Sequence, residues 1–347
     1  MEHERDPDRE RALRARFARV AARLGHAQLR ALADPAELLT EQDLDPASWR
    51  QQSYFLGYYS GEGIRYALEA YGIFDLLRQR GWDGFRVELD LRDRTDQRLR
   101  LYADGHGQRG ALLAELIAHE GTIALPPLPP PSEAAPAAGP ACTAAAARQA
   151  AAGTATRAAE QLLEVVVVEW MTLQAPGLPF RPDRPRLPGQ THPGLGLGLE
   201  VAELLYRMAV RLGKDAVLGF PAYYHNAVLY RARFWFADPR AEGRLLACQR
   251  DLADLSLDAA SWAFELGCVR EHPHGRVVRW RSSEMLMPVA AGAGSRFTDP
   301  RYLERAQRTA ERLRYEVDRE LFAIRRAEEE RRFAECRRAG GGGAQGS

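Results

Sequence analysis

The sequence has few cysteines, a single lysine and no long apolar run, and each shortage excludes a class of protein. Its four cysteines are scattered over 347 residues without a Cys-x-x-Cys pair, so neither a zinc knuckle nor a thioredoxin-like site is indicated. The four consecutive valines at 165–168 are strand-sized, and no apolar run approaches the ~20 residues needed to cross a bilayer. The charged N-terminus lacks the apolar core of a secretory signal. We therefore expect a cytoplasmic protein with reduced cysteines and no membrane partner.

Positive and negative charges are nearly balanced, and almost all of the positive charge is carried by arginine. Lys214 is the only lysine, and the formal net charge is +1. This balance argues against a general polyanion binder, and the scattered aromatic residues form no stacking platform, so nucleic acid is not an expected partner. His192 and His225 lack the HxH or HExxH spacing of metal ligands, so no metal is expected.

Shifts in composition divide the chain. The Pro/Ala-rich stretch 126–159 offers no large side chains for a core and predicts a disordered insertion. Apolar residues at helical spacing predict one long C-terminal helix, whose seam would pack on its own domain or on a second copy in a homodimer. The expected organisation is a helical region at 1–84, an α/β core at 85–125 and 160–290, the C-terminal helix within 291–338 and a flexible tail at 339–347.

The core should contain a central sheet. Residues 85–93 and 97–104 alternate apolar and polar side chains, and with 111–121 they predict an antiparallel meander. The valine-rich segment 162–174 predicts a strand covered on both faces. The fold class expected is α/β of the α+β type, with a mixed, largely antiparallel sheet flanked by helices. Further along the chain, the patterns predict helices at 196–213, 226–233 and 240–266, strands at 214–220 and 234–238, and a hairpin turning at 273–275.

A glycine-rich loop opens the helix that follows the central strand. Gly194, Gly196 and Gly198 allow an anion to approach the free amides of a helix N-terminus, including those of Leu195 and Leu197. Upstream, Gln190 and His192 offer side-chain donors, and Arg181, Arg184 and Arg186 add positive charge. Leu199-Glu200 excludes a Walker loop, and the distance from the strand argues against a dinucleotide fingerprint. The alternative is an ordinary tight entry turn.

The order of these elements resembles the GNAT superfamily of acyl-CoA-dependent N-acetyltransferases. In that family a Gln/Arg-x-x-Gly-x-Gly/Ala loop holds the CoA pyrophosphate, and Gln190-Thr-His-Pro-Gly194-Leu-Gly196 is similar with one additional residue. The family's later helix reads Asn-x-x-Ala-x-x-x-Tyr and then Gly-Phe. Here Tyr230 stands at the tyrosine position, whereas Tyr223 replaces the asparagine and Phe234-Trp235 the Gly-Phe. The resemblance covers about residues 85–238 without the insertion.

The resemblance implies acetyl-CoA or another acyl-CoA as co-substrate and an amine as acceptor. It places Tyr230 near the thioester sulfur as an acid, and it implies a base among Glu169, His192 and His225, with Glu169 preferred. Asn226 joins the loop residues as a candidate cofactor-binding side chain. Two alternatives stay open: a non-catalytic member of the fold that senses a ligand or serves assembly, and purely structural roles for Tyr230 and Glu169.

Overall fold

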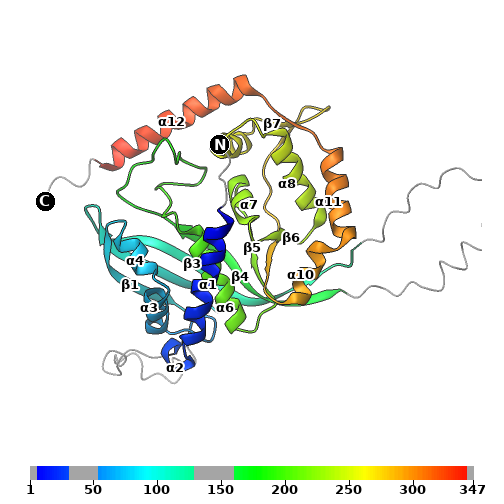
Figure 1. The fold of residues 1–347 in the computed structure, drawn as a ribbon. Helices are drawn as coiled ribbons and strands as arrows, with labels where there is room; N and C mark the ends of the chain where they lie inside the picture. The colour runs from blue at the N-terminus through cyan, green and yellow to red at the C-terminus, as the bar shows by residue number, and fades with distance from the viewer. Residues whose placement is uncertain (1–5, 31–53, 129–159, 342–347) are drawn as a thin grey trace, which may run out of the picture.

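The computed structural model describes residues 6–30, 54–128 and 160–341. Nearly all of the expected insertion at 126–159 and most of the expected tail lie outside these residues. Figure 1 shows the chain as one body in which helices lie against a curved sheet.

A seven-stranded sheet forms the centre of the molecule. Its strand order is β1-β2-β3-β4-β5-β9-β6, and every neighbouring pair is antiparallel except the parallel pair β4–β5. The predicted mixed, largely antiparallel sheet with flanking helices is therefore confirmed. The strands are β1 Trp82–Asp90, β2 Gln97–Gly105, β3 Gln108–Leu125, β4 Gln161–Leu173, β5 Ala216–Gly219, β6 Trp235–Phe236 and β9 Met285–Pro288.

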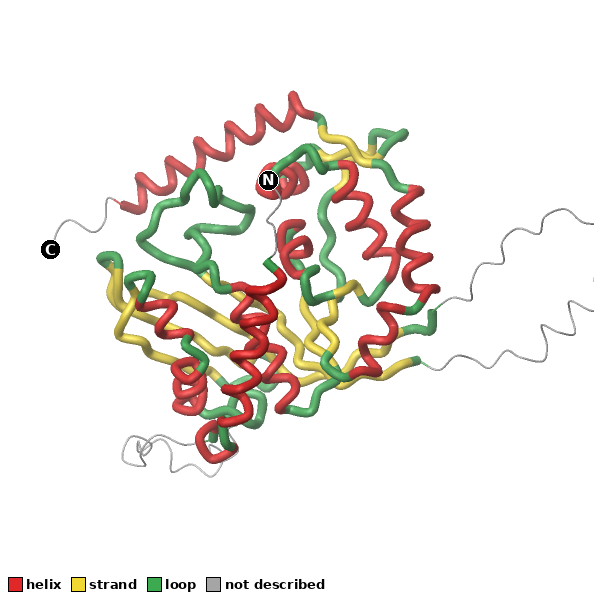
Figure 2. Tube along the Cα trace, viewed as in Figure 1, coloured by secondary structure: helices red, strands yellow, loops and turns green. Residues whose placement is uncertain are grey.

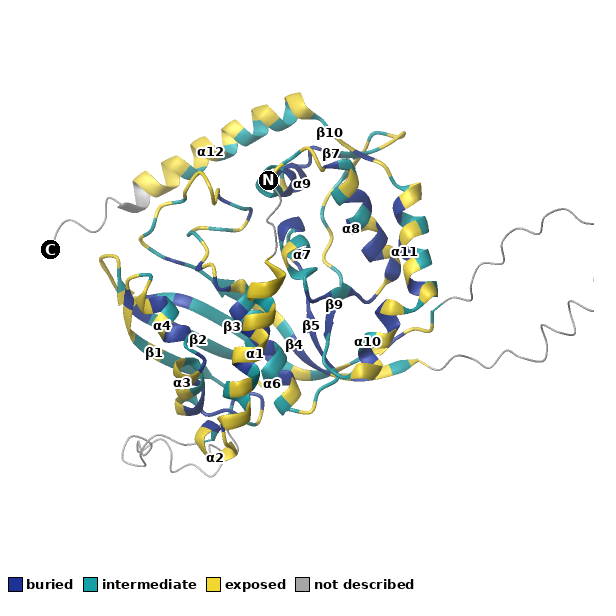
Figure 3. Ribbon diagram, viewed as in Figure 1, coloured by how far each residue is buried: buried dark blue, intermediate teal, exposed yellow. Residues whose placement is uncertain are grey.

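β4 is the central strand, and its valines contact both faces of the sheet. Val165 and Val167 belong to one buried cluster, whereas Val166 belongs to a second, larger one. All three are at most 5% exposed. Each buried valine stabilises the fold by about 1.5–3 kcal/mol. Since this stabilisation requires cover on both faces of the strand, the run of valines favours a place in the middle of the sheet. Figure 3 shows the same region in dark blue.

The helices divide between the two halves of the sheet. In Figure 1, α1, α3, α4 and α6 lie over the half formed by β1–β4, and α7, α8, α10 and α11 lie around the half formed by β5, β6 and β9. Side-chain caps set several helix starts: Asp6 accepts from two amides of α1, and Ser60 accepts from the Gly63 amide of α3. The first eight bounds are α1 Pro7–Arg23, α2 His26–Leu29, α3 Gly61–Ala70, α4 Ile73–Arg78, α6 Gly198–Arg211, α7 Tyr224–Tyr230, α8 Pro239–Asp251 and α9 Leu257–Glu265.

The prediction of one long C-terminal helix was wrong. Three helices occupy this region, namely α10 Ala291–Thr298, α11 Pro300–Arg312 and α12 Arg319–Gly341, and the strand β10 Tyr315–Val317 separates the last two. The helix is interrupted because the Tyr315 amide donates to the Asp251 carboxylate at 2.8 Å and β10 pairs with β7. β10, β7 and β8 form a small second sheet, in which the predicted hairpin is β7 Val269–Glu271 and β8 Arg276–Val278. Similarly, the helix predicted at 240–266 is two helices, α8 and α9.

α12 packs on its own chain. It lies across the loop between β4 and α6 (Figure 2), where Glu329 pairs with Arg186 at 3.1 Å. The Arg186 guanidinium lies 4.4 Å from the ring centre of Trp262 on α9 and 4.1 Å from that of Phe333 on α12. Phe333 of this helix thus packs within the chain, and pairing with a second copy through α12 stays a prediction.

Two helical glycines give a matched test of helix packing. A Cβ on Gly243 of α8 would lie 2.3 Å from the Ala306 carbonyl oxygen of α11, whereas a Cβ on Gly292 of α10 meets nothing within 4 Å. We expect Gly243→Ala to lower the free energy of unfolding by about 1–3 kcal/mol through overpacking. Gly292→Ala should leave it unchanged or raise it by up to about 1 kcal/mol. Urea unfolding measures both, and an equal effect of the two variants would contradict the close α8–α11 contact.

Candidate functional site

The parallel pair at the centre of the sheet separates part-way along its length. β4 and β5 pair from Val165–Ala216 to Val168–Gly219, but β4 continues as a strand to Leu173, paired only with β3. Among the described residues, the β4 edge beyond Val168 therefore has no strand partner on the β5 side. Glu169 lies at this point in a β-bulge, because Val168 and Trp170 pair with consecutive residues of β3. The result is a strand edge without a strand partner at the middle of the sheet, where both edges of a strand are usually paired.

The glycine loop lies beside the free end of β4. The Pro193 carbonyl accepts from the Ala175 amide at 2.7 Å, just beyond the end of the strand. Leu195 and Leu197 are 4% and 2% exposed, whereas Gly194, Gly196 and Gly198 are exposed. The leucines therefore anchor the loop in the core and turn the glycine backbone outward.

The N-terminus of α6 has no side-chain cap. Leu197 is the N-cap residue, and it offers no oxygen to the amides of the first turn. Since Gly198 begins the helix and a Cβ there would meet nothing within 4 Å, the amides at this end are open to a ligand. The free amides and the helix dipole together favour an anion at this position.

Arginines surround this helix end. A Cβ on Gly196, whose φ is +69°, would lie 2.8 Å from Nη1 of Arg184, so the Arg184 guanidinium contacts the loop directly. Burial lowers the pKa of Arg80, and the positive charges of Arg184 and Arg9 lower it further against the opposing effect of Glu200. Three guanidinium groups therefore lie near the first turn of α6. The buried carboxylate of Glu200, which lies 3.8 Å from Arg9, partly balances them.

Of the three arginines that the sequence places in this loop, only Arg184 contacts the glycines. Arg181 pairs with Asp183 at 2.9 Å, and Arg186 is buried between two aromatic rings with Glu329. Arg9 and Arg80, which the sequence analysis did not single out, lie near α6 instead. They come from the N-terminal helices and from the turn before β1, segments more than 100 residues away along the chain.

Gln190 lies against the loop and His192 lies toward α12. The Gln190 amide nitrogen would be 4.0 Å from a Cβ on Gly194, and its Oε1 accepts from the Leu187 amide at 3.1 Å. Gln190 therefore shapes the loop and also presents a donor at Gly194. His192 is half-buried, and burial together with Arg337 of α12 lowers its pKa, so its imidazole is neutral near pH 7.

α7 carries the predicted tyrosine and asparagine side by side. The Asn226 Nδ2 donates to the Tyr230 hydroxyl at 3.4 Å, and burial raises the pKa of Tyr230, which keeps the hydroxyl protonated. The Asn226 Oδ1 is buried and has no hydrogen-bond partner among the described residues. Because a buried acceptor rarely stays unpaired, this oxygen indicates a place for a donor from a ligand. Tyr223 lies at the N-cap of α7 with its hydroxyl against Gly189, so the loop contacts both β4 and α7.

Glu169 is paired with a histidine that the sequence analysis missed. The His119 Nε2 lies 3.2 Å from Oε1 of Glu169, whose side chain is 47% exposed. His119 lies on β3, opposite Val167 of β4. The sequence indicates only that a histidine lies within a strand predicted to neighbour the central one. The pairing itself depends on the register of β3 and β4, which the bulge sets.

His225, a candidate base, lies in the core. It is 5% exposed, and its Nδ1 lies 2.8 Å from the Ser261 hydroxyl on α9. Burial lowers its pKa to about 4. A buried imidazole already engaged with a hydroxyl is poorly placed to take a proton from a substrate, so the structure favours a structural role for His225.

The buried His225 predicts a stability that depends on pH. Its folded-state pKa of about 4 lies below the ordinary value of 6.5, so its contribution is fully present above pH 6.5 and is lost as pH falls toward 4. The difference corresponds to about 3 kcal/mol. We expect wild type to lose this much more unfolding free energy between pH 6.5 and 4 than His225→Gln. His274→Gln, at an exposed histidine, should follow wild type, and identical slopes for all three proteins would contradict the burial argument.

Comparison with known proteins assigns no family. A scan against protein-family models, a search of curated proteins and a search of solved structures each found no match. Among the residues that the structure describes, no three His, Cys, Asp or Glu side chains form a metal-binding group. Within the same residues, every helix is too short or too polar to cross a membrane.

Proposed function

We propose that this protein is an acyl-CoA-dependent N-acyltransferase that transfers an acetyl or other acyl group to an amine. The observation that carries the proposal is that the β4–β5 ladder ends at Val168–Gly219, while the loop that leads to the uncapped amides at Gly198 contacts the free end of β4 at Leu173 and Ala175. This arrangement combines an open strand edge with an anion site, the two features that a pantetheine arm and a pyrophosphate require.

The residues of the site fit the two ends of acyl-CoA. The loop amides from Gly194 to Gly198 and the guanidinium group of Arg184 would hold the pyrophosphate. The β4 edge beyond Val168 would pair with the pantetheine amides, as an added strand pairs with a sheet edge. The unpaired Asn226 Oδ1 would accept from one amide N–H, which removes the cost of leaving that oxygen buried without a donor.

Proton transfer would use groups on β3 and β4, in the loop before α6 and on α7. The acceptor ammonium loses a proton to the Glu169–His119 pair, directly or through water, or to the neutral His192. The free amine nitrogen then bonds to the thioester carbon as the carbon–sulfur bond breaks, and the surplus proton on that nitrogen passes through water to the phenolate that Tyr230 becomes on protonating the thiolate. The departing thiolate takes a proton from the Tyr230 hydroxyl, which its raised pKa keeps protonated until that step.

Tyr230→Phe tests the acid role. Because general acid catalysis contributes 10²–10⁴-fold, we expect kcat for thiol release from acetyl-CoA to fall about a hundredfold, with the Kd of acetyl-CoA unchanged. A panel of small amines and amine-bearing peptides would serve as acceptors. Tyr206→Phe, which changes a tyrosine on α6, should keep full turnover. Unchanged kcat in Tyr230→Phe would remove this hydroxyl from the mechanism.

A non-catalytic ligand-sensing or assembly module of the same fold is the second candidate. The buried Glu200 carboxylate in the first turn of α6 favours it, because this negative charge weakens the anion site. The two candidates differ in turnover. Acetyl-CoA binding without thiol release across the whole amine panel would select the non-catalytic module, whereas amine-dependent thiol release would select the enzyme.

A further inference from the structure

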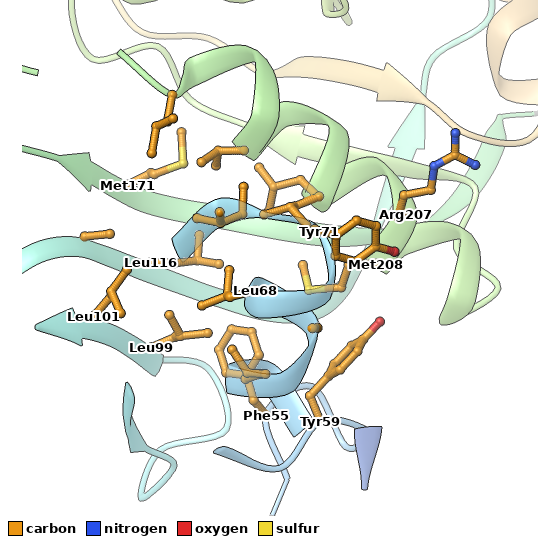
Figure 4. Close-up of a pocket in the computed structure, with 18 of the residues that line it drawn as sticks. Phe55, Tyr59, Leu68, Tyr71, Leu99, Leu101, Leu116, Met171, Arg207 and Met208 are labelled. Carbon is orange, nitrogen blue, oxygen red and sulfur yellow. The ribbon is translucent and has the colours of Figure 1, made fainter. Parts of the chain in front are cut away.

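An apolar cavity of about 160 Å³ lies on the face of the sheet that α6 covers. Side chains of α3, α4, β2, β3, β4 and α6 form most of its walls (Figure 4), together with Phe55, residues near α2, and Leu195 and Leu197 of the glycine loop. Almost all of these side chains are aliphatic or aromatic. A cavity of about this size lined by apolar groups accommodates benzene, so it has room for about six carbon atoms.

The polar side chains of the cavity are gathered at one end. Figure 4 shows Tyr59, Tyr71 and Arg207 on one side of the cavity, whereas Leu101 and Met171 lie on the other. Arg211, one helical turn after Arg207, also lines the cavity. The remaining charged residue in the lining is Glu115, whose carboxylate is engaged with Arg100 at 2.8 Å.

Two buried tyrosines at this end have hydroxyls without a protein partner. Tyr59 and Tyr71 are 8% and 6% exposed, and neither hydroxyl makes a hydrogen bond to any described residue. Neither hydroxyl is among the fully buried unpaired atoms, so both are open to a ligand. Burial raises the pKa of both tyrosines, so both hydroxyls remain protonated donors. Two donors that converge on one end of a cavity call for an acceptor there.

Arg211 leaves a positive charge at the same end. Its two terminal nitrogens donate to the Ala21 and Leu24 carbonyls of α1 at 2.9 and 3.0 Å, which fixes the guanidinium in place. Among the described residues it forms no ion pair with a carboxylate. Arg207, in contrast, pairs with Glu203 at 2.7 Å. The polar end of the cavity therefore carries two hydroxyl donors and a net positive charge, and the other end is purely apolar.

We propose that this cavity binds a medium-chain carboxylic acid, with its carboxylate between Tyr59, Tyr71 and Arg211 and its chain toward Leu101 and Met171. The hydroxyls donate to the carboxylate oxygens, and the Arg211 charge compensates the negative charge. The carboxylate would lie toward the C-terminal end of α6, whereas the loop amides proposed for the pyrophosphate lie at its N-terminal end, where the side chains of Leu195 and Leu197 line the cavity. The inference does not rest on the proposed transferase activity, because Tyr59, Tyr71 and Arg211 have no part in the proposed acyl-CoA site.

Titration calorimetry of the full chain with straight-chain carboxylates of two to twelve carbons tests the proposal. Each added methylene should tighten binding about fourfold while it enters the cavity, and the gain should stop near six to eight carbons. Hexanol, which has the chain without the charge, should bind at least tenfold more weakly than hexanoate. Equal binding of hexanol and hexanoate, or a gain that continues unchanged to twelve carbons, would overturn the proposal.

Two variants test the contacts of the ligand's carboxylate and of its hydrocarbon chain separately. Tyr71→Phe should weaken hexanoate about tenfold and keep the dependence on chain length, whereas Tyr66→Phe, at an exposed tyrosine of α3 outside the cavity, should bind as wild type does. Ala114→Leu fills the cavity from β3, so it should abolish hexanoate binding without lowering Tm. Undiminished binding by Ala114→Leu, or no binding of any carboxylate by wild type, would show that the cavity is not this site.

Discussion

Gly198→Asp should weaken acetyl-CoA binding at least a hundredfold while leaving the protein as stable as wild type or more stable. Gly198 is the first residue of α6, and a Cβ there meets nothing within 4 Å, so the new side chain fits without rearrangement. An aspartate in a first helical turn interacts favourably with the helix dipole. The same carboxylate would lie where the pyrophosphate is proposed to bind. Two charges about 4 Å apart near a protein surface repel by about 4 kcal/mol, which is ample for a hundredfold loss.

The opposite effects on binding and stability make this test specific. Gly198→Ala adds only a methyl group and should reduce affinity little. Calorimetry measures the Kd, and thermal unfolding without ligand measures stability. If Gly198→Asp binds acetyl-CoA as tightly as Gly198→Ala does, the anion site is not at this end of α6. A general loss of stability in Gly198→Asp would contradict the open position that the structure gives this residue.

Glu203→Ala should have the largest effect on folding, lowering the free energy of unfolding by about 3–5 kcal/mol. Glu203 is 1% exposed on α6 and pairs with Arg207 and with Arg233, which is itself 6% exposed. Arg233 also pairs with Glu10 of α1 at 3.1 Å, so the network joins α1, α6 and the chain after α7. Without Glu203, two guanidinium groups lose their shared carboxylate in a buried place.

Urea unfolding of matched variants distinguishes the loss of this buried ion pair from the loss of an exposed one. Glu62→Ala removes an exposed partner of Arg65 and should cost less than about 1 kcal/mol. The double variant Glu203→Met with Arg233→Met should be less destabilised than the sum of the two single variants, because neither member of the Glu203–Arg233 pair is left buried without the other. Additive effects would show that the buried pair contributes no coupling.

The sheet could largely be predicted from the sequence, because its strands carry strong local patterns. The alternation of apolar and polar residues in 85–93 and 97–104 indicates strands with one solvated face. The valines at 165–168 indicate a strand covered on both faces. Strands occur at all three places. β9 escaped prediction because Met285–Pro288 is only four residues long and ends in proline. It lies between β5 and β6 through contacts far apart in the sequence, which no local pattern encodes.

The candidate site was predictable in its loop and less so in its side chains. Leu195 and Leu197 alternate with the three glycines, a pattern that itself indicates a loop anchored on one side. The Glu169–His119 pair depends on a bulge, and a shift of one residue in register would move His119 to a different neighbour. For the same reason, nothing local distinguishes Arg184, which contacts Gly196, from Arg186, which stacks on Trp262.

The most direct test of the acyl-CoA proposal is titration calorimetry of acetyl-CoA into the wild-type chain, with thermal unfolding at the same ligand concentrations. We expect one molecule bound per chain and a Tm that rises with ligand concentration, because a ligand that binds only the folded state stabilises it by mass action. Absence of both heat and a Tm shift at millimolar acetyl-CoA would contradict the assignment of Gly194, Gly196 and Gly198 to a pyrophosphate site.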